Sequence, residues 1–114
     1  MSELVGIVRF KFHEGNVDEF KRLSAQAMEI VRTKDTGTLQ YDTYFNDDES
    51  EAIVIERFRD SEALIEHGAN IGALMEPILA TGTVSGELLG EPSAELRAKL
   101  TGDQPRLFTP YLSM

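Results

Sequence analysis

Four polar residues suited to proton transfer or to stabilising an oxyanion occur on segments that we expect to share one side of a folded domain: Tyr41, Glu56, His67 and Asn70. His67 falls on the apolar stripe of a predicted helix, and imidazole is the side chain best suited to accept a proton near neutral pH. Glu56 stands among apolar neighbours, so burial is expected to raise its pKa. The pattern predicts His67 as a general base, with Glu56 assisting it or orienting it.

The other two residues supply hydrogen-bond donors. Tyr41 and Asn70 are predicted to hold an oxyanion that develops when the base removes a proton from a substrate. An apolar lining would keep water away from that anion. The residues predicted to line the substrate pocket are Phe10, Ile55, Leu64 and Leu74.

Each polar residue also has a purely structural explanation. A buried His67 could be satisfied by a single hydrogen bond and do nothing else. Glu56 could form an ion pair with Arg9 or Arg57 across the sheet, as opposite charges on neighbouring strands commonly do. Tyr41 could be an aromatic core residue with its hydroxyl at the rim.

The sequence lacks several well-known signatures of cofactor binding. It has no Gly-rich phosphate loop, no dinucleotide fingerprint and no nucleophilic serine elbow. His13 and His67 have no histidine neighbour at metal-ligand spacing, and the acidic run 47–51 lacks the central glycine of a calcium loop. We therefore predict no cofactor and no metal ion, with residues 46–50 as a polar hairpin loop.

The spacing of apolar residues predicts the elements that position these side chains. Alternation indicates strands, and three- and four-residue steps indicate helices, the first of which we expect Gly37 to end. The expected strands are 4–12, 38–46, 51–58 and 83–89, the expected helices begin after Asn16 and Asp60, and a short helix 93–100 and an extended segment 107–112 follow. The order β-α-β-β-α-β predicts an α+β, ferredoxin-like antiparallel sheet with a C-terminal helix–strand extension.

The predicted strands are apolar on both faces. Val5 and Ile7 oppose Leu4, Val8 and Phe10 on the first strand. On the third, Ile53 and Ile55 oppose Ala52, Val54 and Phe58. Two helices can cover one face only, and an apolar face left open would be a large sticky patch. We therefore predict a homodimer whose sheets pack face to face, with the C-terminal extension reaching across the partner.

The order and spacing of several short runs resemble the antibiotic biosynthesis monooxygenase (ABM) domain over about residues 4–90. The runs are Gly37 with Tyr41, the segment 56–60 (Glu-Arg-Phe-Arg-Asp), Ala63-Leu64 with His67, and the strand–turn–helix opening 12–20. The resemblance implies a dimeric α+β barrel made of two ferredoxin-like protomers. It also implies a pocket between sheet and helices, with His67 at the family's common helix histidine and Glu56 at its common strand carboxylate.

The same resemblance implies a chemistry. Some members of the family oxidise phenolic or quinol substrates with O2 and without metal or flavin, whereas others have different activities or none known. We therefore expect a cofactor-independent monooxygenase acting on a small phenolic, quinol-like or enolisable compound. The alternative is a non-catalytic dimer that binds a small ligand or serves an assembly, because the open apolar face needs a partner and nothing more.

The length and net charge of the chain limit the number of domains and the classes of binding partner. The 114 residues suit one domain, and the net charge is −9. Residues 1–90 carry 17 acidic and eight basic residues, whereas 91–114 carry three of each, so we divide the chain into a ferredoxin-like ABM-type domain, 1–90, and a C-terminal extension, 91–114, expected to be a dimer arm. The negative charge argues against nucleic acid and anionic membranes as partners and favours a neutral small molecule.

Cysteine usage and the N-terminus predict a compartment. The chain has no cysteine, so a disulfide framework is excluded. The first residues show neither a basic segment nor a long apolar run, and no apolar run approaches the ~20 residues of a membrane helix. We expect a cytoplasmic protein.

Overall fold

A computed structural model describes residues 3–114 of the chain. The helices and strands follow the predicted order, with the extension contributing a short helix and a short strand. They are β1 (Leu4–Phe12), α1 (Val17–Lys34), β2 (Thr38–Phe45), β3 (Glu51–Phe58), α2 (Ser61–Leu79), β4 (Gly82–Leu89), α3 (Ala94–Lys99) and β5 (Arg106–Phe108).

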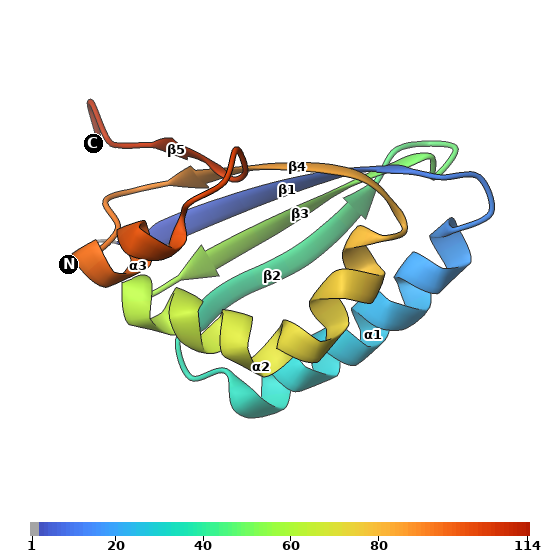
Figure 1. The fold of residues 1–114 in the computed structure, drawn as a ribbon, viewed down its shortest axis with the longest axis horizontal. Helices are drawn as coiled ribbons and strands as arrows, with labels where there is room; N and C mark the ends of the chain where they lie inside the picture. Colours follow the sequence, from blue (N-terminus) through green and yellow to red (C-terminus); the bar gives the residue numbers. More distant parts are fainter. Residues whose placement is uncertain (1–2) are drawn as a thin grey trace.

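One five-stranded sheet in the order β2-β3-β1-β4-β5 carries the fold. The first four strands pair antiparallel, and β5 adds to the edge in parallel with β4. Figure 1 shows α1 and α2 side by side on the same face of this sheet. The α+β ferredoxin-like fold class is confirmed, and the sheet is open rather than closed into a barrel.

The hydrophobic core lies between the sheet and the two long helices. Its larger cluster combines β1 and β3 with α1 and α2, and includes Phe10, Phe20, Leu23, Ala27, Ala52, Val54 and Ile78. A second cluster at the other end of the sheet contains Leu4, Leu88 and Leu96, all 3 % exposed or less. Because Leu96 belongs to α3, the extension shares the core of the domain rather than standing apart from it.

The first helix ends earlier than Gly37 would require. It stops at Lys34, and Asp35 already has extended backbone angles, with φ −74° and ψ 135°. Gly37 is needed for a different reason, since a Cβ on it would lie 2.4 Å from the Cβ of Ala63 in α2. The expected left-handed stop is therefore wrong, and the glycine permits close packing of the β2 entry against α2.

The C-terminal extension pairs with its own chain in this structure. Leu88 of β4 registers with Leu107 of β5, and the N–H of Gly90 donates to the carbonyl of Phe108 at 3.0 Å. Beyond β5 the chain projects from the sheet edge, with Tyr111 91 % and Leu112 83 % exposed (Figure 1). A role as a dimer arm remains a prediction, and only the residues after Phe108 are free of the sheet to fulfil it.

The second helix continues through Pro77 to Leu79 without breaking. Its side chains divide between both clusters of the core, so its whole length covers the sheet. Within residues 3–114, no helix combines the length and the hydrophobicity needed to cross a membrane.

Candidate functional site

Strand alternation brings Tyr41 and Glu56 together on the face that the helices cover. They are direct cross-strand partners in the β2–β3 ladder, and Glu56 registers on its other side with Gly6 of β1. A Cβ on Gly6 would lie 3.5 Å from Oε1 of Glu56, an ordinary van der Waals distance, so the carboxyl group lies directly beside the backbone of Gly6. The two residues predicted from different strands therefore do share one location.

Glu56 does not form the ion pair that the alternative explanation required. Arg9 contacts Glu87 at 3.3 Å and Arg57 approaches Glu3 at 3.8 Å. Side chains alternate between the two faces of a strand. Arg57 directly follows Glu56, and Arg9 is three residues after Gly6, the cross-strand partner of Glu56, so both arginines face the opposite side of the sheet. Among residues 3–114, Glu56 has no ion-pair partner.

Burial raises the pKa of the Glu56 carboxyl above its ordinary value. Two charges act on it in opposite directions: His67 lowers the pKa and Asp35 raises it. Burial also raises the pKa of the Tyr41 hydroxyl, and the carboxylates of Glu56 and Asp35 add to that effect. Tyr41 is therefore a neutral hydrogen-bond donor at physiological pH.

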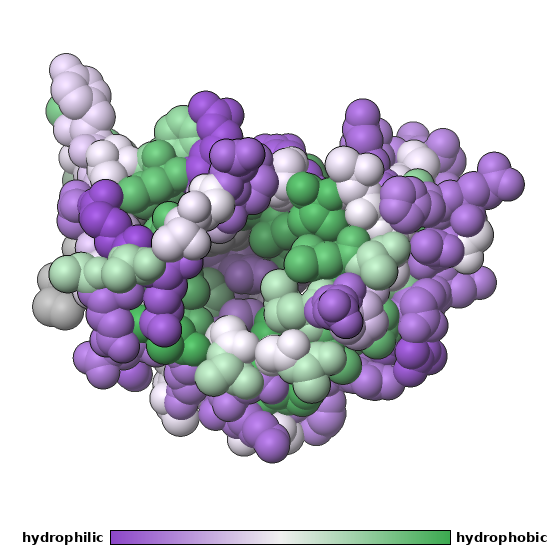
Figure 2. All heavy atoms as spheres, viewed as in Figure 1, coloured by the Kyte–Doolittle hydropathy of each residue, from purple (hydrophilic) through white to green (hydrophobic). Residues whose placement is uncertain are grey.

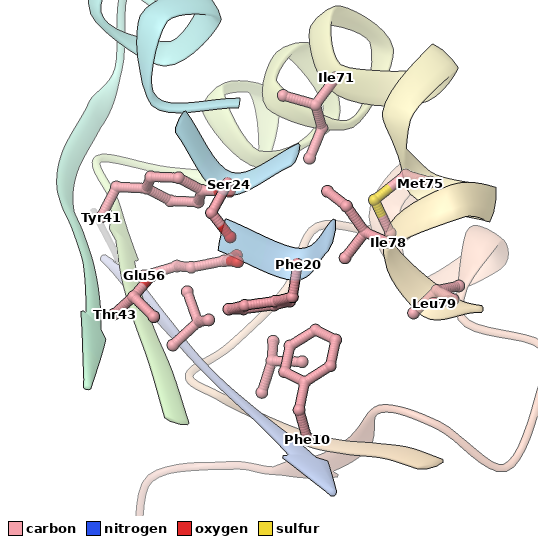
Figure 3. A pocket seen from close by; sticks show the side chains of 12 residues that line it. Phe10, Phe20, Ser24, Tyr41, Thr43, Glu56, Ile71, Met75, Ile78 and Leu79 are labelled. Carbon is pink, nitrogen blue, oxygen red and sulfur yellow. The ribbon is translucent and has the colours of Figure 1, made fainter. Parts of the chain in front are cut away.

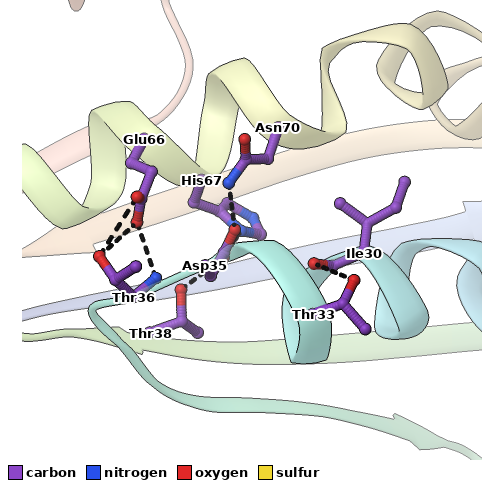
Figure 4. A network of polar contacts seen from close by, with 8 residues as sticks. All are labelled: Ile30, Thr33, Asp35, Thr36, Thr38, Glu66, His67 and Asn70. Carbon is purple, nitrogen blue, oxygen red and sulfur yellow. Dashed lines mark hydrogen bonds and ion pairs between the residues drawn. The ribbon is translucent and has the colours of Figure 1, made fainter.

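His67 is held by a carboxylate that the sequence analysis did not identify. Its Nδ1 lies 2.8 Å from Oδ2 of Asp35, and Figure 4 shows the Asp35 side chain between His67, Asn70 and Thr38. Nδ2 of Asn70 donates to Oδ1 at 2.8 Å, and the hydroxyl of Thr38 donates to Oδ2 at 2.6 Å. The Asp35 carboxylate is 1 % exposed and the His67 side chain 5 %.

These contacts set the charge of Asp35. Burial alone raises its pKa, but the hydrogen bonds from Asn70, Thr38 and His67 outweigh that effect and leave the pKa below its ordinary value. Asp35 is consequently an anion, and an anion at Nδ1 places the ring proton on that nitrogen. The other nitrogen, Nε2, is buried and has no hydrogen-bond partner within the described part of the chain.

The imidazole ring lies between two aromatic side chains. Its centroid is 5.4 Å from that of Tyr41 and 5.1 Å from that of Phe58. Tyr41 thus contacts His67 with its ring and is the cross-strand partner of Glu56. The arrangement links the Asp35–His67 pair to Glu56 through one side chain.

A cavity of about 60 Å³ opens beside Glu56 and Tyr41 (Figure 3). Its wall is mostly aromatic and aliphatic, and its other polar side chains are Ser24 of α1 and Thr43 of β2. Figure 3 shows the Glu56 carboxyl group directed between Ser24 and Phe20. Ile71, one helical turn after His67, lines the cavity, whereas His67 itself lies outside the lining.

The predicted pocket residues fare unevenly. Phe10 lines this cavity. The prediction that Ile55 lines the pocket is wrong. Ile55 falls between Val54 and Glu56 on the strand and so faces the opposite side of the sheet. Leu64 packs against the second core cluster and Leu74 against the first, and neither is among the residues that line the cavity.

Asn70 was predicted to hold an oxyanion in the pocket, but its side chain lies elsewhere. Its amide donates to Asp35, and the residue lies outside the cavity lining. The signal that could have revealed Asp35 is weak, namely a carboxylate that follows a helix terminus three residues before a threonine. Its partners His67 and Asn70 are 32 and 35 residues away, and spacing along the chain does not encode such a contact.

The acidic hairpin tip forms contacts of its own. Asp48 accepts hydrogen bonds from the backbone and hydroxyl of Ser50, and these bonds lower its pKa. In the range 3–114 there is no group of three His, Cys, Asp or Glu side chains arranged to hold a metal ion.

Comparison with known families decides the classification. Residues 4–70, more than half of the chain, match the family model described as "Antibiotic biosynthesis monooxygenase". The chain belongs to the ABM family. The matched segment contains the Asp35–His67–Asn70 network together with Tyr41 and Glu56.

Solved structures show the same fold at low sequence identity. The ABM chain aligns with MupZ from Pseudomonas fluorescens with a TM-score of 0.79 and 21 % identity, over 98 % of this chain and 88 % of that one. Rv0793 from Mycobacterium tuberculosis aligns with a TM-score of 0.69 and 23 % identity, over 80 % of this chain and 96 % of that one.

A third structure is named for its chemistry. SnoaB, a cofactor-independent oxygenase from Streptomyces nogalater, aligns with a TM-score of 0.66 and 18 % identity, over 75 % of this chain and 89 % of that one. No curated protein matches the sequence.

Proposed function

We propose that this ABM protein is a monooxygenase that uses O2, without a metal or flavin, to oxidise a small phenolic, quinol-like or enolisable compound. The observation that carries the proposal is Glu56, a carboxyl with a raised pKa and no ion-pair partner in residues 3–114, at the wall of a largely apolar cavity beside Tyr41. A base whose pKa approaches the working pH is efficient in proton transfer. Family membership and the named oxygenase SnoaB support the same reaction class.

The reaction that this site suits is the conversion of an activated CH2 group into a carbonyl. Glu56 removes one proton, and the hydroxyl of Tyr41 stabilises the anionic oxygen of the resulting enolate or phenolate. The anion donates electrons to O2 and becomes a carbon-bound peroxide anion, which takes the proton back from Glu56 to form a hydroperoxide. Loss of the second hydrogen from that carbon then breaks the O–O bond and yields the carbonyl and one water.

This reaction balances without a further reductant. The carbon loses four electrons, O2 gains four, one oxygen atom enters the product, and the other leaves as water. The apolar wall protects the anion from water before it meets O2.

We assign His67 to a position behind Glu56 rather than to first contact with the substrate. The ring contacts Tyr41, and its positive charge when protonated lowers the pKa of Glu56. Asp35 fixes the ring through Nδ1, while Asn70 and Thr38 fix Asp35. The order of the two bases is therefore the reverse of the one expected from the sequence.

Oxygen uptake with a panel of small quinols and enolisable aromatic ketones tests the proposal. Glu56→Gln should lower kcat/KM by about 10²- to 10⁴-fold, the usual contribution of a general base, and remove the limb of the pH profile that rises through the pKa of Glu56. The matched control is Glu51→Gln, an exposed carboxylate on the same strand. In His67→Ala the rising limb should move to higher pH, because the electrostatic interaction with His67 that lowers the pKa of Glu56 is removed.

Three results would contradict the proposal. Unchanged turnover in Glu56→Gln would remove that residue from the mechanism. Turnover without O2 would indicate an isomerase that uses the same base. Absence of the ¹⁸O label in the product after reaction under ¹⁸O2 would exclude a monooxygenase.

A non-catalytic ligand-binding or structural protein is the second candidate, and the size of the cavity favours it. A cavity that holds benzene measures about 150 Å³, whereas this one measures about 60 Å³. Ligand binding without oxygen uptake across the panel would support this candidate. The enzyme proposal requires the cavity to widen at its flexible wall, where Met75 is 38 % and Leu79 42 % exposed.

We also propose that two copies of the chain assemble through the face of the sheet that carries no long helix. Ile7 and Ile55 are cross-strand partners at its centre, and Val5 with Leu89 and Tyr44 with Ile53 extend the apolar area. Two charged residues lie on the same face: Arg9 is the cross-strand partner of Ile53 and Glu87 that of Ile7, and they form an ion pair with each other at 3.3 Å. Burial of the apolar side chains around this pair against a second copy would remove them from water.

A further inference from the structure

We propose that the C-terminal extension builds a second part of the binding site, a groove for a neutral apolar chain attached to the reacting ring. This inference rests on the proposed function in one respect, namely that the reacting ring of the substrate lies at Glu56. The groove has a volume of about 400 Å³ and lies between the end of α2, strand β4 and the loop that precedes β5. Figure 2 shows that this face of the molecule is hollowed, with hydrophobic side chains along one margin.

The groove and the small cavity are neighbours with a common wall. Val8, Met75 and Leu79 line both of them. Met75 and Leu79 are partly exposed, and methionine and leucine side chains adjust their rotamers readily. Movement of these two side chains would join the groove to the cavity at Glu56 and supply the space that the cavity lacks.

One wall of the groove comes from the extension, outside the segment that matches the ABM family model. Oε1 of Gln104 accepts a hydrogen bond from the backbone N–H of Gly86 at 2.7 Å. Gly86 has no side chain, and Pro105 lies 3.7 Å from the place a Cβ would occupy there. The loop is thus seated directly on β4, where a side chain at position 86 would begin to fill the groove.

Both ends of this loop are anchored in the fold. On one side Leu96 of α3 is 2 % exposed in the cluster with Leu4 and Leu88, and the N–H of Ser93 donates to the hydroxyl of Ser61 at 2.8 Å. On the other side β5 pairs with β4. A wall held at both ends can present a defined surface to a ligand.

The chemistry of the wall selects the ligand class. No charged residue lines the groove. Its polar lining residues are Ser85 and Gln104, and the rest are apolar residues and glycines. An ionised chain would lose its hydration without compensation there, whereas an alkyl or similar chain gains from burial. The substrate inferred is therefore a neutral amphipathic molecule, with a phenolic or enolisable ring at Glu56 and an apolar chain under the extension.

Calorimetric titration without O2, using hydroquinones with n-alkyl chains from methyl to octyl, tests the groove apart from turnover. The native protein should bind about fourfold more tightly for each added methylene, equivalent to about 0.8 kcal/mol, until the groove is full. Gln104→Ala should weaken this dependence on chain length and leave methylhydroquinone binding unchanged. Leu79→Trp should abolish the gain from long chains, whereas Ala73→Trp, on an exposed position of α2, should behave as the native protein.

An affinity that does not depend on chain length would overturn the proposal that the groove binds an alkyl chain. The same conclusion would follow if the native protein, Gln104→Ala and Leu79→Trp all showed the same dependence on chain length. Displacement of octylhydroquinone by a synthetic peptide of residues 109–114 would overturn it as well, because the occupant would then be the C-terminus of a second copy. Binding that depends on chain length, without oxygen uptake, would support the groove and contradict the proposed monooxygenase activity. Oxygen uptake at a rate independent of chain length would support the monooxygenase activity and contradict the groove.

Discussion

At the scale of single residues, the polar site is organised by Asp35. Its carboxylate accepts hydrogen bonds from three residues and carries the charge that orients His67. A buried carboxylate with a full set of donors is stable as an anion, but it leaves all its partners unsatisfied when it is removed. Asp35 therefore serves stability and the geometry of the site together.

Replacement of Asp35 by Asn should lower the free energy of unfolding at neutral pH by about 3 kcal/mol, the usual cost of breaking a buried charged pair. The folded pKa of Asp35 is lowered, so its contribution is fully present above the unfolded pKa and is lost as the pH falls toward the folded one. The difference between native protein and variant should shrink on the acid side. Urea unfolding across this pH range measures it.

The control for that measurement is Asp47→Asn, an exposed carboxylate in the hairpin loop between β2 and β3. It should change the free energy of unfolding by no more than about 0.5 kcal/mol, as is usual for surface positions. Equal effects of the two substitutions, or a pH-independent effect at Asp35, would show that the network contributes nothing specific.

At the scale of elements, the site depends on how closely α2 approaches the start of β2. Gly37 permits that approach, since its α-carbon faces Ala63 with no space for a methyl group. The backbone carbonyl of Gly37 also accepts the N–H of Arg59 at 2.8 Å, just before α2 begins. The position of His67 over Tyr41 follows from this contact, because His67 is one turn further along the same helix.

Gly37→Ala should lower the free energy of unfolding by about 1–3 kcal/mol, the usual cost of overpacking, and should disturb the His67 environment. Gly68→Ala is the matched control, because a Cβ at that exposed position of α2 meets nothing within 4 Å. The control should stabilise the protein by up to about 1 kcal/mol through helix propensity. Thermal unfolding together with the histidine signals in NMR would measure both effects, and destabilisation by the control would contradict this account of α2.

At the scale of the whole molecule, the open face of the sheet is the surface through which we propose that two copies assemble. Three cross-strand pairs place apolar side chains there, and the long helices lie on the other side (Figure 1). Burial of this area against a second copy removes apolar surface from water without any change in the pocket. The candidate site and the proposed interface therefore lie on opposite faces of the same strands.

Light scattering of the native protein should give twice the 12.7 kDa of one chain. Ile55→Lys places a charge at the centre of the open face and should yield a folded monomer, whereas Ala69→Lys on the exposed side of α2 should leave the dimer intact. A native mass of 12.7 kDa would exclude assembly through this face. Ile55→Lys that remains dimeric would place the interface elsewhere.

Local spacing accounts for what could be predicted from the sequence alone. Strands alternate and helices repeat every 3.6 residues by backbone geometry, so the order of the elements and the shared face of Tyr41 and Glu56 follow from the chain itself. The same alternation should have excluded Ile55 from the pocket, since it adjoins Glu56. The glycine at position 37 was recognised as important but for the wrong contact.

Tertiary structure alone decided the contacts between distant segments. Asp35 meets His67 and Asn70 because the end of α1 lies beside the middle of α2, and nothing near Asp35 in the sequence encodes that. The cavity and the groove are the spaces left after side chains from four or more elements have packed, so their walls cannot be assigned one element at a time. Residue types determined which chemistry was available, and packing decided that Glu56, not His67, faces the space where it could occur.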